Sequence, residues 1–93
     1  MPVRSAVVSG RVQGVCFRMF VLDAAKSLGL SGEVWNRADG AVEVLFASDD
    51  PTRLDELAKL LWDGPGWVRE VRIEELSADV RPEGFRVGPT RPA

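Results

Sequence analysis

The sequence contains no histidine, and this absence excludes several kinds of active site. A Ser-His-Asp triad, a histidine general base and most catalytic zinc sites all require an imidazole ring. The single cysteine, Cys16, also excludes an internal disulfide, a CxxC redox motif and a thiolate cluster. A nucleophilic role for Cys16 stays open, but its apolar neighbours Val15 and Phe17 and the lack of a histidine partner favour packing.

Long apolar runs and an excess of positive charge are also missing. No segment approaches the roughly 20 apolar residues that cross a membrane. No basic N-terminal region precedes an apolar stretch, as it would in a secretory signal. The net charge of −2 argues against sequence-independent binding of nucleic acid. We therefore expect a cytoplasmic protein that binds neither nucleic acid nor a membrane.

The residues that are present have the composition of one small globular domain. The chain has 93 residues, of which 45% are hydrophobic and 28% are charged, and this is enough for one core. We expect a single, monomeric domain over residues 1–93. Residues 88–93, which include two prolines, are expected to form a frayed tail.

Hydrophobic periodicity predicts the order strand, helix, strand, strand, helix, strand, with a short strand at the end. Apolar residues recur with helical spacing from Phe17 to Leu28 and from Leu54 to Leu61, and Asp39-Gly40 is typical of a hairpin turn. The expected strands are residues 3–12, two strands flanking that turn within residues 31–46, residues 68–76 with Val71 and Ile73 facing inward, and Phe85 to Val87. This order is the split β-α-β arrangement of ferredoxin-like folds, an α+β class in which two helices cover one face of an antiparallel sheet.

Both helices also carry signals at their ends. Gly29 is expected to end the first helix in a left-handed conformation. Asp50 is expected to cap the second helix, because the residue before a proline avoids the helical region and Pro51 suits the first helical position.

The segment from Gly10 to Arg18 joins the first strand to the first helix and is the main candidate for a binding site. A loop that enters a helix directs several unpaired backbone N–H groups to one point, where the helix dipole attracts anions. Gly14 leaves room for a ligand near the backbone, and the guanidinium of Arg18 can grip two oxygens at once. These features predict a cradle for an oxyanion such as phosphate. A second interpretation stays open, in which Gly10 and Gly14 only shape a turn and Arg18 is solvated.

Asn36 is the second candidate, at the end of a strand and on the face that it shares with Val34. The helices are expected to cover that face, so the start of the first helix should lie near Asn36. The alternative is an asparagine that begins the turn and bonds to its own hairpin. Carboxylate pairs are weaker candidates: the hairpin and an exposed strand face explain Asp39 and Glu43, and helix capping explains Asp49-Asp50.

Two motifs in this sequence resemble those of the acylphosphatase family. The first is GRVQGVCFR at residues 10–18, and the second is GEVWNRADGAVE at residues 32–43. Leu28-Gly29-Leu30, Gly64-Pro65 and Phe85-Arg86-Val87 extend the resemblance over nearly the whole chain. The sequence departs from the family pattern after Gly32, where an aromatic residue is usual and this chain has Glu33, with the aromatic residue at Trp35. Residues 47–49 also lack the glycine that often follows the third strand.

The resemblance implies a ferredoxin-like sandwich that hydrolyses the carboxyl-phosphate anhydride of small acyl phosphates, without a metal or cofactor. It places the catalytic arginine at Arg18 and the catalytic asparagine at Asn36. The phosphate-binding loop that it implies consists of Gln13, Gly14, Val15, Cys16, Phe17 and Arg18.

This chemistry needs no histidine, because the leaving carboxylate has a conjugate acid with a pKa of roughly 4 and departs unprotonated. Arg18 and the loop amides would hold the phosphoryl oxygens, while Asn36 positions a water molecule. The alternative is a non-enzymatic module that binds an anion for regulation, since ferredoxin-like domains often bind ligands.

Overall fold

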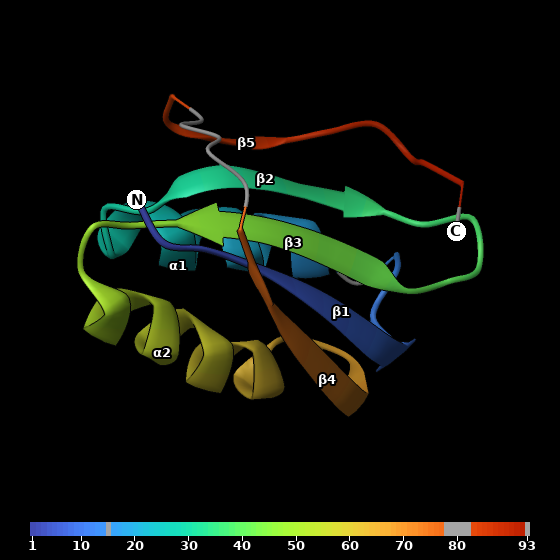
Figure 1. Cartoon of the computed structure of the whole chain (residues 1–93). Helices are drawn as coiled ribbons and strands as arrows, with labels where there is room; N and C mark the ends of the chain where they lie inside the picture. Colours follow the sequence, from blue (N-terminus) through green and yellow to red (C-terminus); the bar gives the residue numbers. More distant parts are fainter. Residues whose placement is uncertain (15, 78–82, 93) are drawn as a thin grey trace.

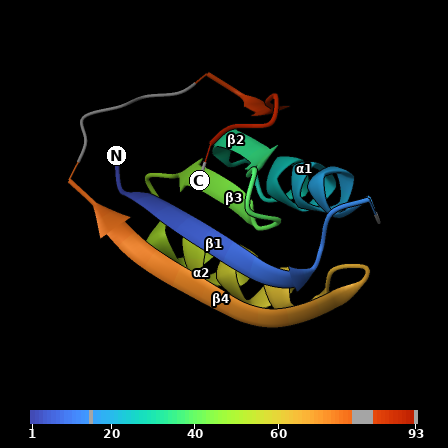
Figure 2. The same ribbon diagram turned by 90° about the vertical axis from the view of Figure 1, so that its right-hand side faces the viewer.

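The computed structural model describes residues 1–14, 16–77 and 83–92, which form one five-stranded sheet with two α-helices packed on it. The strands stand in the order β4-β1-β3-β2-β5 across the sheet (Figure 1). Figure 2 shows both helices on the same side of the sheet. The elements are β1 (Val3–Arg11), α1 (Phe17–Ser27), β2 (Ser31–Asn36), β3 (Val42–Ala47), α2 (Pro51–Leu60), the 3-10 turn η1 (Leu61–Asp63), β4 (Trp67–Leu76) and β5 (Phe85–Val87). Neither α-helix of the described residues is long and apolar enough to cross a membrane.

Strands β1 to β4 pair with one another in antiparallel fashion: β1 pairs with β3 and β4, and β2 pairs with β3. The short β5 instead runs parallel to β2, from Gly32 opposite Phe85 to Val34 opposite Val87. The predicted α+β class and the predicted order of elements are confirmed. The last strand makes the sheet mixed rather than purely antiparallel.

The hydrophobic core lies between the helices and the face of the sheet that they cover. Strand side chains alternate between the two faces, so every second residue reaches the core, whereas each helix contributes residues three or four positions apart. The fully buried side chains include Ala6, Val8, Val34, Val44 and Phe46 from the strands and Phe17, Val21, Ala25, Leu54 and Leu57 from the helices.

One predicted core position is more exposed than expected. Val71 and Ile73 lie opposite Val8 and Ala6 of β1, so both face the helices. Val71 packs against the core, but Ile73 is 37% exposed. The difference arises because β4 is the outermost strand, where the core face is only partly covered.

The predicted helix ends are both confirmed. Asp50 Oδ1 accepts hydrogen bonds from the N–H of Thr52 at 3.0 Å and from its hydroxyl at 2.6 Å, and Pro51 is the first helical residue. These two bonds, the hydroxyl bond first, hold the pKa of Asp50 below its ordinary value. At the end of α1, Gly29 has a φ of 69° and its N–H donates to the carbonyl of Lys26.

The expectation of a frayed tail at residues 88–93 is wrong at Gly88 and Arg91, which are hydrogen-bonded to β2 and the turn after it, and the last residue of the segment lies outside the described residues. The chain continues along β2 after β5: the N–H of Gly88 donates to the Val34 carbonyl at 2.8 Å, and that of Arg91 to the Asn36 carbonyl at 2.9 Å. Figure 1 shows this segment running beside β2 towards the β2–β3 turn. The two prolines misled the prediction, because the edge of β2 offers backbone partners that hold the segment in place.

Replacement of Gly10 by alanine is expected to destabilise the fold strongly. Gly10 has a φ of 131° and lies at the register shift between β1 and β4, where a Cβ would overlap the Trp67 carbonyl and lie 2.8 Å from the Arg69 nitrogen. We expect Gly10→Ala to lower the free energy of unfolding by about 2–4 kcal/mol, measured by denaturant titration. Gly40→Ala is the control, because Gly40 also has a positive φ, of 95°, but an added Cβ meets no atom within 4 Å. Equal losses in the two variants would contradict the steric explanation.

Candidate active site

A cavity of about 320 Å³ lies where the loop before α1, the first turn of α1, the end of β2 and strand β5 meet. The residues that line it are Val12, Gly14, Cys16, Phe17, Arg18, Met19, Asn36 and Val87. The structure therefore brings Arg18 and Asn36, which come from different elements, to the same cavity.

Arg18 lies in the first turn of α1 and is partly buried. Its Nη1 is 3.5 Å from the carbonyl oxygen of Gly88, at the long limit of a hydrogen bond. In the described part of the chain no carboxylate pairs with Arg18. Most of the N–H groups of its guanidinium are therefore available to an anion in the cavity.

Helix α1 begins without a side-chain cap from the described residues. Cys16 occupies the cap position in a left-handed conformation with a φ of 63°, and no side chain of the described residues accepts from the first-turn amides. The first turn also contains no acidic residue. Because the first N–H groups of a helix have no intrahelical partner, this end of α1 is electropositive and open to an anion. Cys16 is exposed, so the predicted packing role does not describe its side chain.

The loop before α1 is fixed by the side chain of Gln13. Its Nε2 donates to the carbonyl of Arg37 at 2.8 Å and to that of Ala41 at 2.9 Å, which fastens the loop to the β2–β3 hairpin. Gln13 does not line the cavity, and Val15 lies outside the described residues. Gly14 lines the cavity with a φ of 73°, and a Cβ there would meet no atom within 4 Å, so the positive φ explains this glycine.

Asn36 is the last residue of β2 and lies opposite Val42 of β3. Its Oδ1 is buried and has no hydrogen-bond partner among the described residues. A buried carbonyl oxygen without a donor costs roughly 1–3 kcal/mol, so such groups are rare unless a water or ligand completes them. Asn36 thus lines the cavity with an amide group whose oxygen no described residue satisfies.

One interpretation of the sequence expected the side chain of Asn36 to bond to the backbone of its own hairpin. The side chain of Asp39 makes this bond instead, because its Oδ1 accepts from the N–H of Ala41 at 3.2 Å. That backbone bond, followed by the hydrogen bond from Arg37, holds the pKa of Asp39 below its ordinary value. The carboxylate also pairs with Arg37 at 2.8 Å. Asp39 is therefore a structural residue of the turn.

One part of the cavity wall is apolar. Met19 is 51% exposed and Val87 is 37% exposed, and both line the cavity. Phe17 contributes to the wall as well, but its side chain is 1% exposed and belongs to the core. The site combines an electropositive end with an apolar surface that remains open to solvent.

Residues 1–14, 16–77 and 83–92 contain no group of three or more histidine, cysteine, aspartate or glutamate residues that could hold a metal ion. Three of the four acidic residues considered in the sequence have other partners: Asp39 and Glu43 both pair with Arg37, and Asp50 caps α2.

Sequence reasoning missed the part of the site that comes from the C-terminal segment. Val87 lines the cavity and Gly88 contacts Arg18. The sequence predicts a short strand at Val87 and a frayed tail at Gly88, and gives neither residue a place in the site. A local signal was present at Glu33, where the sequence departs from the family pattern and the aromatic residue stands instead at Trp35. Both residues contact the side chain of Arg91.

Comparison with known proteins agrees with the resemblance. The acylphosphatase family model matches residues 4–87. An acylphosphatase of Alkalilimnicola ehrlichii is 47% identical over 85 residues, covering 90% of this chain and 94% of the relative. An acylphosphatase of Rhizobium meliloti is 42% identical over 82 residues, covering 86% of this chain and 85% of the relative.

A solved structure also supports the assignment. The crystal structure of an acylphosphatase from Bacillus subtilis superposes with a TM-score of 0.90 at 31% identity, covering 95% of this chain and 99% of that chain. The family model, the relatives and the shared fold lead to one conclusion: the chain belongs to the acylphosphatase family, hydrolases that act on the acid anhydride bond of acyl phosphates.

Proposed function

We propose that Arg18 and the amides at the start of α1 bind the phosphoryl group of a small acyl phosphate, and that Asn36 positions the attacking water. The products are a carboxylate and inorganic phosphate. The observation that supports this assignment is the cavity, which combines an uncapped helix N-terminus with Arg18 and the Oδ1 of Asn36, neither of which has a side-chain partner among the described residues.

The phosphoryl end of the substrate would occupy the electropositive end of the cavity. The guanidinium of Arg18 offers a planar pair of donors that matches two phosphoryl oxygens. The first-turn amides and the dipole of α1 add fixed positive potential as negative charge develops in the transition state. Together they hold the phosphorus in place for in-line attack.

Asn36 would orient the water by accepting a hydrogen bond at Oδ1. An amide is a poor base, so Asn36 does not remove the proton. None of the lining residues of the described cavity is a carboxylate, and the chain has no histidine. We therefore assign the proton of the water to a phosphoryl oxygen as the water oxygen bonds to phosphorus and the bond to the carboxylate breaks.

The acyl group would lie along the apolar wall of the cavity. Met19 and Val87 provide exposed apolar surface beside the proposed phosphoryl site. The carboxylate leaves without a general acid because it is already a weak base. This accounts for catalysis in a cavity whose lining residues, among those described, include no carboxyl or imidazole group to act as a general acid.

Arg18→Lys tests the binding role of the guanidinium. Lysine keeps the positive charge but loses the planar pair of donors, so we expect turnover of benzoyl phosphate to fall by about 10²-fold or more. Inorganic phosphate should raise the thermal midpoint of the wild type by mass action and raise that of the variant less. Arg69→Lys, on exposed β4, is the matched control and should retain full turnover. Near-wild-type turnover of Arg18→Lys would remove Arg18 from the proposed role.

Asn36→Ala separates positioning from binding. Loss of a group that contacts chiefly the attacking water should lower kcat by about 10²–10³-fold. The inhibition constant of inorganic phosphate should change by far less. Because Oδ1 already lacks a partner, stability should change by no more than about 1 kcal/mol. If phosphate affinity falls in step with kcat, Asn36 contacts the phosphoryl group instead of the water.

Removal of divalent metal ions is expected to leave turnover unchanged, because every proposed step is carried out by this chain's own residues and the substrate. The measurement is the hydrolysis rate before and after dialysis against a chelator. A large fall in the hydrolysis rate that added magnesium or zinc reverses would contradict the proposal. Asp49 and Asp50 would then be the first candidates for metal ligands.

A further inference from the structure

The C-terminal segment contacts β2 at the point where Asn36 lies. We define residues 88–91 as the C-terminal clamp. The N–H of Gly88 donates to the Val34 carbonyl at 2.8 Å, and the N–H of Arg91 donates to the Asn36 carbonyl at 2.9 Å. The carbonyl of Arg91 in turn accepts from the N–H of Ala38 at 2.8 Å. These bonds continue the parallel pairing of β2 and β5 beyond the end of both strands.

The clamp gives Asn36 a backbone partner on each side. On one side Asn36 pairs with Val42 of β3, and on the other its carbonyl accepts from Arg91. Without the clamp, this end of β2 would be a free edge of the sheet. Strand ends and edges open more readily than central strands, so the side chain of Asn36 would then occupy a wider range of positions.

The side chain of Arg91 anchors the clamp to β2. Its guanidinium carbon lies 4.1 Å from the centre of the Trp35 ring, and its Nη2 forms an ion pair with Glu33 Oε2. Trp35 is only 9% exposed, and the side chain of Glu33 is 13% exposed. A cation over an indole face, combined with a charged hydrogen bond at a largely covered carboxylate, holds better than a solvated ion pair.

The contacts of the Arg91 side chain restrain Trp35, the residue next to Asn36. Trp35 precedes Asn36 in β2, so a fixed indole ring also restrains the backbone of its neighbour. This chain departs from the second family motif at Glu33, and the aromatic residue stands instead at Trp35. The contacts of both residues with Arg91 give this exchange a physical explanation.

The clamp also reaches Arg18. The carbonyl oxygen of Gly88 is 3.5 Å from Arg18 Nη1, while the N–H of the same residue donates to Val34 of β2. Gly88 is buried, and a Cβ there would overlap the carboxylate of Glu33. The clamp is therefore in contact with both proposed catalytic residues, more closely with Asn36 than with Arg18.

We propose that Arg91 is a positioning residue, which holds the C-terminal clamp against Trp35 and Glu33 and thereby fixes Asn36 for attack by water. This inference rests on the role proposed for Asn36. Misplacement of a catalytic group by about 1 Å can cost roughly 10²-fold in rate, so even a partly released strand end has a measurable effect.

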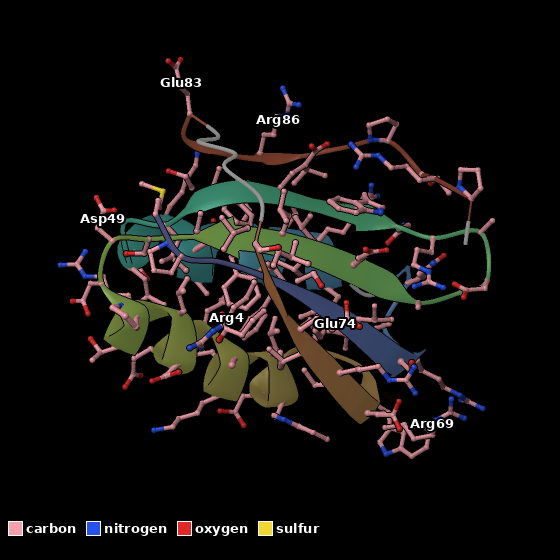
Figure 3. The ribbon with its side chains drawn as sticks, in the orientation of Figure 1. Arg4, Asp49, Arg69, Glu74, Glu83 and Arg86 are labelled. Atoms are coloured by element: carbon pink, nitrogen blue, oxygen red, sulfur yellow. The ribbon has the colours of Figure 1, made fainter. Side chains whose placement is uncertain are left out.

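The first test compares Arg91→Ala with Arg86→Ala. Arg86 also pairs with Glu33, at 3.4 Å, but its side chain is 77% exposed and projects outward from β5 (Figure 3). We expect Arg91→Ala to lower kcat by about 10-fold or more, with little change in the phosphate inhibition constant, and Arg86→Ala to leave both values unchanged. Arg91→Lys keeps the charge over the ring and should recover part of the loss. Rates are compared well below the thermal midpoint of each variant, and Arg91→Gln replaces Arg91→Ala if the latter does not fold.

The second test is a double-mutant cycle with Asn36→Ala. If Arg91 acts through Asn36, the Arg91 substitution should have almost no further effect on kcat once Asn36 is alanine. Additive losses would overturn the proposal, because they would show that Arg91 acts on the site by another route. Wild-type kcat in Arg91→Ala, while Asn36→Ala is impaired, would overturn the clamp alone. Wild-type kcat in Asn36→Ala would overturn the role of Asn36 and, with it, the positioning role of Arg91.

Discussion

The position of the site depends on the burial of Phe17. Phe17 is the first residue of α1 and is 1% exposed, and its ring fills the space that a Cβ on Gly64 would need. The start of α1 is thus held between the sheet and the segment after α2. Arg18 follows directly and lines the cavity, so a core contact and a ligand contact are one residue apart. Because protein interiors are close-packed, a change in the volume of this part of the core would move the arginine.

The two helices differ in whether a side chain caps the N-terminus. Asp50 satisfies the N-terminus of α2, whereas α1 begins at Cys16 with no side-chain cap among the described residues. At the same cavity Asn36 adds a buried oxygen that has no hydrogen-bond partner in the part of the chain that the structure describes. Both features lower stability locally, and the rest of the core compensates for them. Local departures of this kind are expected where a protein binds a ligand, because the ligand completes what the fold leaves open.

Most of the fold could be predicted from local patterns, and the site could be predicted in part. The helical spacing after Phe17, the Asp39-Gly40 turn and the Asp50-Pro51 cap each act over a few residues, so the sequence displays them directly. The placement of Arg18 and Asn36 at one cavity was anticipated from the face of each element, with the family resemblance adding their roles.

The path of the C-terminal segment could not be predicted in the same way. Its hydrogen bonds join residues far apart in sequence, and two prolines near the chain end are typical of a frayed tail. Ile73 was misjudged for a related reason, because its exposure depends on β4 being an edge strand. Periodicity identifies which face a residue occupies but not how far the opposing layer extends over it.

The order of the strands has a consequence for behaviour at high protein concentration. Free strand edges can pair with other molecules, and charged side chains discourage such pairing. The outer edge of the sheet at β4 carries the exposed residues Arg69, Glu70, Arg72, Glu74 and Glu75, of which Arg69 and Glu74 are labelled along the strand in Figure 3. On the other side of the sheet, β5 and the residues after it cover the backbone edge of β2. The segment that borders the cavity therefore also hides the strand edge on which intermolecular β-aggregation would otherwise begin.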